Sequence, residues 1–350
     1  MKSKRRVIVA VSAVVVILGV VFGIFYSGLF NAPPPKPKKP KVAVRPKKPK
    51  HKKDKTICPF DGKAGDVQAT RPLAIMVENL STIRPQAGLG SACVVVEGLA
   101  EGGITRFMLV FGLHGADNIG PVRSARVHFA ALASGWNAIY GHVGGSIYAM
   151  KAIRNWGIND WDQMGHSDAY TRVGWTKAPH NVFTSTSRLR EAAAKFKDGG
   201  DIFDRGFKFK AAPPMEARPE GLKKVTIDFS SSEYRVEYQY DRQSNTYKRF
   251  NGGQPHTDAN SKLQLAPTNI VVLRASTNDI PGGSGVLDIN MEGTGNLTVF
   301  RDGQVVEGTW ERLTHDSPLK LKNSNGNGIR LSPGQTWIEI VRPTTAVTIQ

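Results

Sequence analysis

An apolar run near the N-terminus limits where a chain like this can reside. Residues 7–30 (VIVAVSAVVVILGVVFGIFYSGLF) contain no charged side chain over 24 positions. As an α-helix the run is about 36 Å long, which exceeds the roughly 30 Å hydrocarbon core of a bilayer. A cleaved signal peptide has a shorter apolar region that ends in small residues of the A-x-A type, and this run lacks that ending. We therefore predict an uncleaved, single-pass transmembrane anchor over residues 7–30.

A segment rich in Pro and Lys follows the apolar run. Residues 31–55 (NAPPPKPKKPKVAVRPKKPKHKKDK) hold too few apolar side chains to form a core, and their like charges repel one another. In polyproline geometry, at about 3.1 Å per residue, the segment reaches up to roughly 75 Å. We predict a disordered, extended linker. Its basic part, residues 36–55, either binds anionic wall polymer or lipid headgroups or remains a solvated stalk.

The positive charge of the chain is concentrated in this N-terminal part. Residues 1–55 hold 15 of the 47 Lys and Arg residues and one of the 29 Asp and Glu residues, so they carry a net charge of +14 and the rest of the chain carries +4. A basic domain that coats nucleic acid is not supported, and we expect no nucleic-acid partner. Because long domains translocate largely regardless of flanking charge, we predict a cell-membrane protein whose folded domains are extracytoplasmic.

The remaining residues change character near position 215. Between residues 71 and 209 short apolar runs alternate with helical patterns, which is typical of an α/β arrangement. After Pro219 the pattern has a period of two, as in residues 234–240, where Tyr and Val alternate with charged or polar residues. We predict an α+β fold with an α/β-type domain over residues 56–212 and a mainly β domain over residues 220–345.

Periodicity and turn residues also place individual elements. Helices are expected at residues 147–156 and 187–197, and a third begins with Pro121 in its first turn and ends before Gly135. A hairpin turn is expected at residues 302–303. Strands are expected at residues 73–77, 93–96, 106–113, 138–143, 225–229, 234–240, 269–275, 297–301 and 337–341.

The chain has two cysteines, Cys58 and Cys93. Two are too few for a disulfide scaffold, and their spacing is not that of a zinc site. In an oxidising compartment they can form one bridge, which closes a loop of about 35 residues and contributes about 3 kcal/mol in the chain-entropy model. Two unpaired, buried thiols are the alternative, and we predict no cofactor.

Ionisable side chains gather in four short motifs between residues 97 and 181. Charges in such Gly-lined or apolar surroundings are costly unless they are paired or bind a ligand. The candidate site residues are Glu97, Glu101 and Arg106 in EGLAEGGITRF, Arg123 and Arg126 in GPVRSAR, His142 and Ser146 in GHVGGS, and Lys177, His180 and Asn181 in KAPHN.

The two arginines and the glycine turn indicate an anion site. On a helix Arg123 and Arg126 face the same side near its N-terminus, where backbone N–H groups also attract anions. The alternative is that they pair with Glu97 or Glu101 and fasten the helix to the sheet. GHVGGS has the local form of an anion-binding turn, but it is neither a Walker loop nor a nucleophile elbow.

His142 and His180 are the candidates for a general base, with Glu97 and Glu101 as further catalytic candidates. A metal site would need both histidines to converge with a carboxylate such as Glu101 or Asp160, and the sequence offers no His-x-x-x-His spacing. We predict no metal site. Glu97 and Glu101 are also too close in sequence to flank a glycosidic bond readily.

Several motifs resemble those of one family. RPLAIMVEN, RPQAGL, VVVEGLAEGGITRF, IGPVRSAR, GHVGGS and KAPHN occur in the order found in the YerB-like family, domain of unknown function 3048. YKRFNGGQPHTD, TNIVVL, GTW and GQTWIEI resemble its C-terminal domain and add His256 and Asp258 as candidate ligand-binding residues. The resemblance implies a two-domain body in the bacterial cell envelope, since members are typically lipoproteins that face outward.

This chain departs from the family pattern in two places. It has an apolar span where members have a lipidated cysteine, and it carries Cys93 where relatives commonly have Asp. We predict a membrane-anchored envelope protein that binds an anionic envelope component or a membrane partner through its Arg/His cluster. The alternative is a hydrolase or transferase acting on an envelope glycan or phosphodiester, with His142 or His180 as general base and Arg123 or Arg126 stabilising negative charge.

Overall fold

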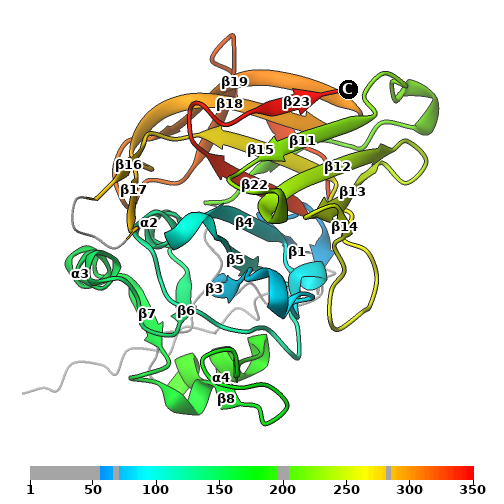
Figure 1. Cartoon of the computed structure of the whole chain (residues 1–350). Coiled ribbons are helices and arrows are strands. Elements are labelled where there is room, and N and C mark those ends of the chain that lie inside the picture. Colours follow the sequence, from blue (N-terminus) through cyan, green and yellow to red (C-terminus); the bar gives the residue numbers. More distant parts are fainter. Residues whose placement is uncertain (1–55, 66–70, 196–204, 281–284) are drawn as a thin grey trace, which may run out of the picture. The chain divides into compact units, whose positions relative to one another are not determined.

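The computed structural model describes residues 56–65, 71–195, 205–280 and 285–350. The predicted anchor and linker, residues 7–30 and 31–55, lie outside these ranges. Within them no helix combines the length and the apolar character needed to cross a membrane. The described residues form an α+β fold in which sheet predominates over three α-helices (Figure 1).

The first half of the chain builds one side of a large sheet. Its strands are β3 (Leu73–Glu78), β4 (Val94–Leu99), β5 (Thr105–Phe111), β6 (Ile139–His142) and β7 (Asn159–Asp162). β5 lies antiparallel between β4 and β3, whereas β3, β6 and β7 run parallel to one another. Every residue of β3, β4 and β5 is buried, because both faces of the sheet are covered. The four strands expected here from apolar runs are confirmed.

The second half of the chain completes the same sheet. It adds β15 (Asn269–Arg274), β18 (Gly293–Arg301), β19 (Gln304–Arg312), β20 (Lys320–Asn323) and β22 (Thr336–Val341). The strand order is β20-β19-β18-β15-β22-β4-β5-β3-β6-β7. β22 pairs in parallel with β4, with Thr336 opposite Val94. The sheet therefore takes strands from both sides of the predicted domain boundary, and the boundary itself stays a prediction.

A five-stranded sheet covers one face of β22 and β4. Its order is β14 (Gln254–Pro255), β13 (Thr246–Asn251), β12 (Arg235–Asp241), β11 (Lys224–Asp228) and β23 (Val347–Ile349). In β12 the predicted alternation is confirmed, because Val236 and Tyr238 are buried and their neighbours are more exposed. The guanidinium of Arg249, on β13, lies 4.1 Å from the ring centroid of Trp337, so the two sheets are in direct contact.

Helices α2 (Val127–Gly135), α3 (Ile147–Trp156) and α4 (Thr186–Lys195) belong to the first half. α3 has its predicted bounds: the Ser146 hydroxyl caps its first turn by accepting from Ala149 N at 3.2 Å, and Gly157 ends it with φ +61°. α2 covers the face of β4 opposite the five-stranded sheet, because His128 Nε2 lies 3.4 Å from where a Cβ at Gly98 would be.

The predicted helical start at Pro121 is wrong. Residues 119–126 are extended, and the helix begins only at Val127. Arg123 N donates to Met76 O at 3.1 Å, and Ala125 N donates to Gly144 O at 2.9 Å. These tertiary hydrogen bonds satisfy the backbone as well as a helical turn would, and they hold the segment between the end of β3 and the GHVGGS turn.

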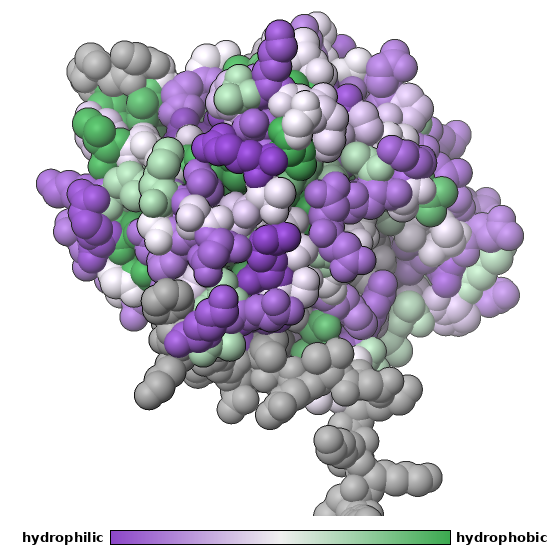
Figure 2. Space-filling view, turned by 90° about the horizontal axis from the view of Figure 1, so that it is seen from below, coloured by the Kyte–Doolittle hydropathy of each residue, from purple (hydrophilic) through white to green (hydrophobic). Residues whose placement is uncertain are grey.

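The remaining strands are short pairs at the periphery. The predicted hairpin turn between β18 and β19 is confirmed, since Asp302 and Gly303 have φ values of +54° and +70°. The side of the molecule that carries α4 is mostly hydrophilic, with small apolar patches (Figure 2). The short strand pairs at the periphery are β1 (Thr56–Ile57) with β2 (Ala64–Gly65), β8 (Thr171–Arg172) with β9 (Val182–Phe183), β10 (Lys208–Phe209) with β21 (Arg330–Leu331), and β16 (Thr277–Asp279) with β17 (Leu287–Ile289).

Candidate functional site

Three parallel strands end at one edge of the main sheet, and each ends in an ionisable residue. Glu78 is the last residue of β3, His142 of β6 and Asp162 of β7. The extended segment 119–126 crosses this edge through the bridges of Val122 to Val77 and of Ala125 to Gly145. Ligands of α/β sheets commonly bind beyond the carboxyl ends of the strands, so we treat this edge as the candidate site.

Arginines and carboxylates are brought together at this edge in what we call the strand-end cluster: Glu78, Glu101, Arg106, Arg123, Arg126 and His180. Arg123 Nε lies 3.3 Å from Glu78 Oε1, and His180 Nδ1 lies 2.7 Å from Glu78 Oε2. Arg126 forms an ion pair with Glu101. The expectation that these arginines pair internally therefore holds for Arg126 and Glu101, whereas the partner of Arg123 is Glu78, which sequence reasoning missed.

Arg106 is the cation of this cluster without a carboxylate of its own. Its side chain is 8% exposed, it donates to the backbone oxygen of Ser124 at 3.1 Å, and it forms no ion pair within the described residues. Its Nε is buried and has no hydrogen-bond partner there. Burial, reinforced by the nearby charge of Arg126, lowers the pKa of Arg106 to about 10. The guanidinium is still charged at neutral pH, so the cluster has one cation more than it has carboxylates.

The GHVGGS turn binds an anion, but the anion belongs to the protein. Gly144 N donates to Asp162 Oδ1 at 2.8 Å, and the Ser146 hydroxyl is used as the cap of α3. His142 is fully buried, with Nε2 at 2.9 Å from Asp160 Oδ1 and Nδ1 at 2.9 Å from Gly144 O. Both ring nitrogens are therefore engaged by groups of the protein itself. A ring held in this way is a poor general base.

His180 is placed differently from His142. Its Nδ1 contacts the Glu78 carboxylate, its side chain is 24% exposed, and it lines a pocket of about 360 Å³. The pocket lies where the two halves of the chain meet, because Asn118 of the first half and Lys262 of the second both line it. Within the strand-end cluster, His180 is the residue that both contacts a carboxylate and lines a cavity.

The other predicted site residues have structural surroundings or lie apart. Lys177 is exposed, and the Asn181 side chain accepts from Arg172 at 3.0 Å. His256 is buried, with Nδ1 against Arg249 and Nε2 at 3.2 Å from the Gln86 side chain. Asp258 accepts from the backbone N–H groups of residues 90, 260 and 261 and thereby fixes its loop.

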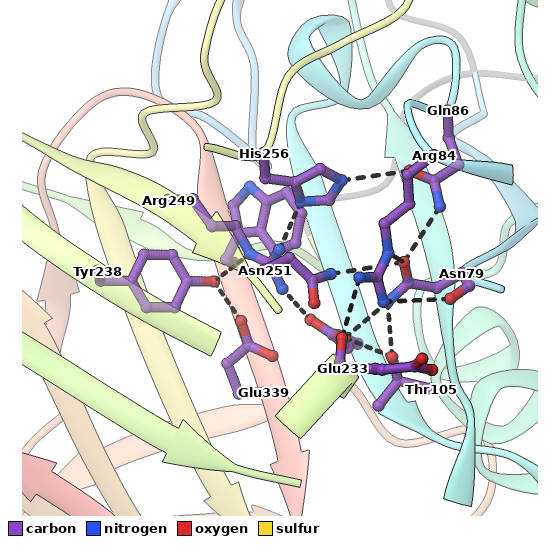
Figure 3. Close-up of polar contacts among 12 residues, drawn as sticks. Asn79, Arg84, Gln86, Thr105, Glu233, Tyr238, Arg249, Asn251, His256 and Glu339 are labelled. Carbon is purple, nitrogen blue, oxygen red and sulfur yellow. Dashed lines mark hydrogen bonds and ion pairs between the residues drawn. The ribbon is translucent and has the colours of Figure 1, made fainter. Parts of the chain in front are cut away.

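A separate, buried polar network that includes Arg249, Tyr238 and Glu339 lies between the two sheets (Figure 3), and Glu97 belongs to it. Glu97 and Arg249 form an ion pair, and both side chains are inaccessible to solvent. Arg249 Nε donates to the Tyr238 hydroxyl at 3.0 Å, and that hydroxyl donates to Glu339, which lies opposite Glu97 in the β4–β22 pair. Burial, with the adjacent charge of Glu97, raises the pKa of Glu339 well above its ordinary value. The network fastens the halves together and opens into none of the five pockets described at the surface.

Sequence reasoning missed Arg249, Tyr238 and Glu339. One signal was present: Glu339 is the sole ionisable residue in the apolar run WIEIV of residues 337–341. A carboxyl in a fully buried strand requires a polar partner, and this requirement points to a buried network rather than to a ligand site.

Potential metal ligands were also located in the described part of the chain. Cys58, Asp61 and Cys93 are the one group of three whose ligand atoms lie within 4.8 Å of one another. The two Sγ atoms are 3.9 Å apart, and both thiols are buried. His142 and His180 contact different carboxylates and do not come together as a pair of ligands.

Comparisons with known proteins agree with this architecture. Residues 61–199 match the model described as "Protein of unknown function (DUF3048) N-terminal domain", and residues 225–338 match that of its C-terminal domain. The chain is 32% identical over 308 residues to "Putative lipoprotein YerB" of Bacillus subtilis (strain 168), covering 84% of this chain and 89% of the relative. The crystal structure of YerB from Bacillus subtilis superposes with a TM-score of 0.74 and 29% identity, covering 84% of this chain and all of that one. The chain therefore belongs to the YerB-like, DUF3048 family.

Proposed function

We propose that this chain is a cell-envelope protein that binds an anionic envelope component at the strand-end cluster. The observation that carries the proposal is Arg106, which is more than nine-tenths buried, lies within the electrostatic reach of Arg123 and Arg126, and forms no ion pair with a carboxylate of the described residues. An excess cation in a desolvated setting is costly by itself and favourable when an anion completes it.

The envelope location rests on different support. The relative in Bacillus subtilis is described as a lipoprotein, and a lipid-anchored protein is held at a membrane surface. In this chain we propose that the apolar residues 7–30 supply the anchor and the basic residues 31–55 the spacer. Wall polymers and lipid headgroups at that location are rich in phosphate and carboxylate, which are the groups that arginine binds best.

Binding to the full-length chain tests the proposal. The probes are a glycerol-phosphate hexamer and a muropeptide, and the variant is Arg123→Ala/Arg126→Ala. The double variant leaves Glu78 and Glu101 without these cations, so the charge of Arg106 no longer exceeds that of the carboxylates around it, and binding is expected to weaken by at least about tenfold. The matched control, Lys63→Ala/Lys151→Ala, removes two positive charges outside the cluster and keeps the basic tail, so it should change affinity by less than about twofold. Equal effects of the two double variants would assign the binding to net charge and refute the cluster.

A hydrolase or transferase is the second candidate, and the His180–Glu78 contact favours it. A carboxylate at 2.7 Å from Nδ1 orients the ring and leaves Nε2 for a water or hydroxyl in the pocket. We expect any turnover of the two probes to be abolished by His180→Ala and largely retained in Lys151→Ala. If the wild-type protein binds a probe and leaves it intact over hours, the binding function stands alone.

A further inference from the structure

We infer that the pocket beside the strand-end cluster binds a sugar ring that carries a carboxylate. The inference rests on the proposed function, because it assigns a ligand class to the same region of the protein. Two basic residues, His180 and Lys262, line the pocket, and its lining includes no acidic residue. The Lys262 ammonium forms no ion pair within the described ranges. Arg123 contacts the same carboxylate as His180, that of Glu78, and donates to the backbone oxygen of Pro179 at 3.3 Å. The charge of the walls thus selects an acidic ligand.

The apolar part of the pocket indicates a ring. Trp175 is 70% exposed, although its ring centroid lies 5.1 Å from that of Phe183. Pro85 and Pro121 also line the cavity, and most of its surface is apolar. A tryptophan combines a broad apolar face with a polar N–H, and such a surface suits the C–H face of a pyranose better than it suits an inorganic anion.

The remaining lining groups suit hydroxyls. Thr176 brings a hydroxyl to the wall, and Asn118 brings a side-chain amide, which donates one hydrogen bond to Asn260 Oδ1 at 3.4 Å and keeps its oxygen as an acceptor. Asn118 is fixed from the second half of the chain, because Asn260 Nδ2 donates to its backbone oxygen at 2.8 Å. The wall is therefore formed before any ligand arrives. Its volume, about 360 Å³, falls within the usual range for small-ligand pockets.

The test uses the full-length protein labelled with 5-fluorotryptophan, so that binding to the basic tail does not contribute to the signal. The resonance of Trp175 is the one lost in Trp175→Phe. Three probes are titrated: a tetrasaccharide alternating glucuronic acid and N-acetylglucosamine, the neutral tetrasaccharide of N-acetylglucosamine, and tripolyphosphate. The acidic tetrasaccharide is expected to shift the Trp175 resonance saturably, at concentrations at least about tenfold lower than the neutral one. Lys262→Ala should weaken this response about tenfold, and Lys151→Ala, at an exposed lysine of α3, should not.

The outcomes separate this inference from the function on which it rests. If the Trp175 resonance does not move with the acidic sugar, or moves equally with the neutral sugar or with tripolyphosphate, the ligand class assigned here is wrong. In that case binding of anionic probes that still depends on Arg123 and Arg126 would leave the proposed function intact. If no anionic probe binds in a way that depends on those arginines, both proposals are refuted.

Discussion

At the residue scale, two glutamates on neighbouring strands have opposite electrostatic roles. Glu97 is paired with the buried cation of Arg249, whereas Glu339 accepts from the Tyr238 hydroxyl and has a pKa raised well above its ordinary value. A buried ion pair is strongly destabilised by removal of one partner, but a carboxyl that is already neutral can be replaced by an amide.

We therefore expect Glu97→Gln and Glu339→Gln to differ sharply. Glu97→Gln leaves the Arg249 cation uncompensated and should lower the free energy of unfolding by about 3 kcal/mol. Glu339→Gln should lower it little at pH 5 and raise it relative to the wild type at pH 8. In the wild type the unfolded carboxyl ionises above about pH 4.5, whereas the raised pKa of the folded carboxyl delays its ionisation, so the wild type loses up to about 1.4 kcal/mol per pH unit between the two pKa values. Urea unfolding at both pH values measures this, and equal losses in the two variants would contradict it.

His128 provides a pH prediction of the opposite sign. It lies in the first turn of α2, buried and with neither ring nitrogen hydrogen-bonded, and burial, with Arg126 and Arg106 nearby, lowers its pKa to about 3. The neutral His128 ring therefore adds its full contribution to the free energy of unfolding above pH 6.5, the pKa of the unfolded chain. This contribution is lost as the pH falls towards 3, the pKa of the folded protein.

Replacing this ring with an apolar side chain should reduce the acid sensitivity. His128→Leu is expected to raise the free energy of unfolding by about 1 kcal/mol at pH 7.5, because two unsatisfied nitrogens leave the core. The gain should grow by up to about 1.4 kcal/mol per pH unit below 6.5. Thermal melts between pH 4 and 7.5 provide the measurement, and His114→Leu, at an exposed histidine, should keep the wild-type slope. An unchanged slope in His128→Leu would assign the acid sensitivity to other groups.

At the element scale, Cys58, just after β1, lies against Cys93, just before β4. Their Sγ atoms are 3.9 Å apart, so formation of a disulfide requires only a small movement. Treatment of the full-length chain with oxidised glutathione should form it by thiol–disulfide exchange, with the two protein thiols oxidised and one glutathione disulfide reduced to two thiols.

The expected product is a chain with no alkylatable thiol before reduction and two after it. Closing a loop of about 35 residues should raise the free energy of unfolding by about 3 kcal/mol relative to the reduced protein, and Cys93→Ser should show no such increase. Denaturing alkylation followed by mass measurement counts the thiols. Two alkylated cysteines after prolonged oxidation would support the alternative of a pair of inert, buried thiols.

Also at this scale, the accuracy of the sequence predictions follows from how local their signals are. α3 was predicted at its observed bounds, because Ser146 and Gly157 cap it within the sequence itself. The segment around Arg123 was predicted as helix and is extended, because its backbone partners, Met76 and Gly144, come from other parts of the chain. Glu101 was recognised as a possible partner of Arg126 because buried charges need partners, whereas Glu78, at the end of β3, was not considered as the partner of Arg123.

At the scale of the whole molecule, the two halves recognised as separate family domains share a single sheet. β22, from the C-terminal half, lies between β15 and β4, and all six of its residues are buried. The Glu97–Arg249 ion pair crosses the same junction. Both β4 and β22 were predicted as strands, but nothing local to either could identify its partner, since pairing between distant strands leaves no repeat or turn signal in the sequence.

The shared sheet predicts that neither half folds alone. Without residues 213–350, β4 loses its neighbour β22 and becomes a long apolar edge, and Glu97 is left as a charge without its cation. We expect residues 1–212 and 213–350, expressed separately, to aggregate or to be degraded rapidly by protease, with no cooperative thermal transition. Co-expression of the two fragments should restore a single cooperative transition and protease resistance, as the strands can pair across a break in an exposed connection. A cooperative melt of either fragment alone would show that the halves are independent domains, and the ligand pocket they share at Asn118 and Lys262 would then depend on docking rather than on folding.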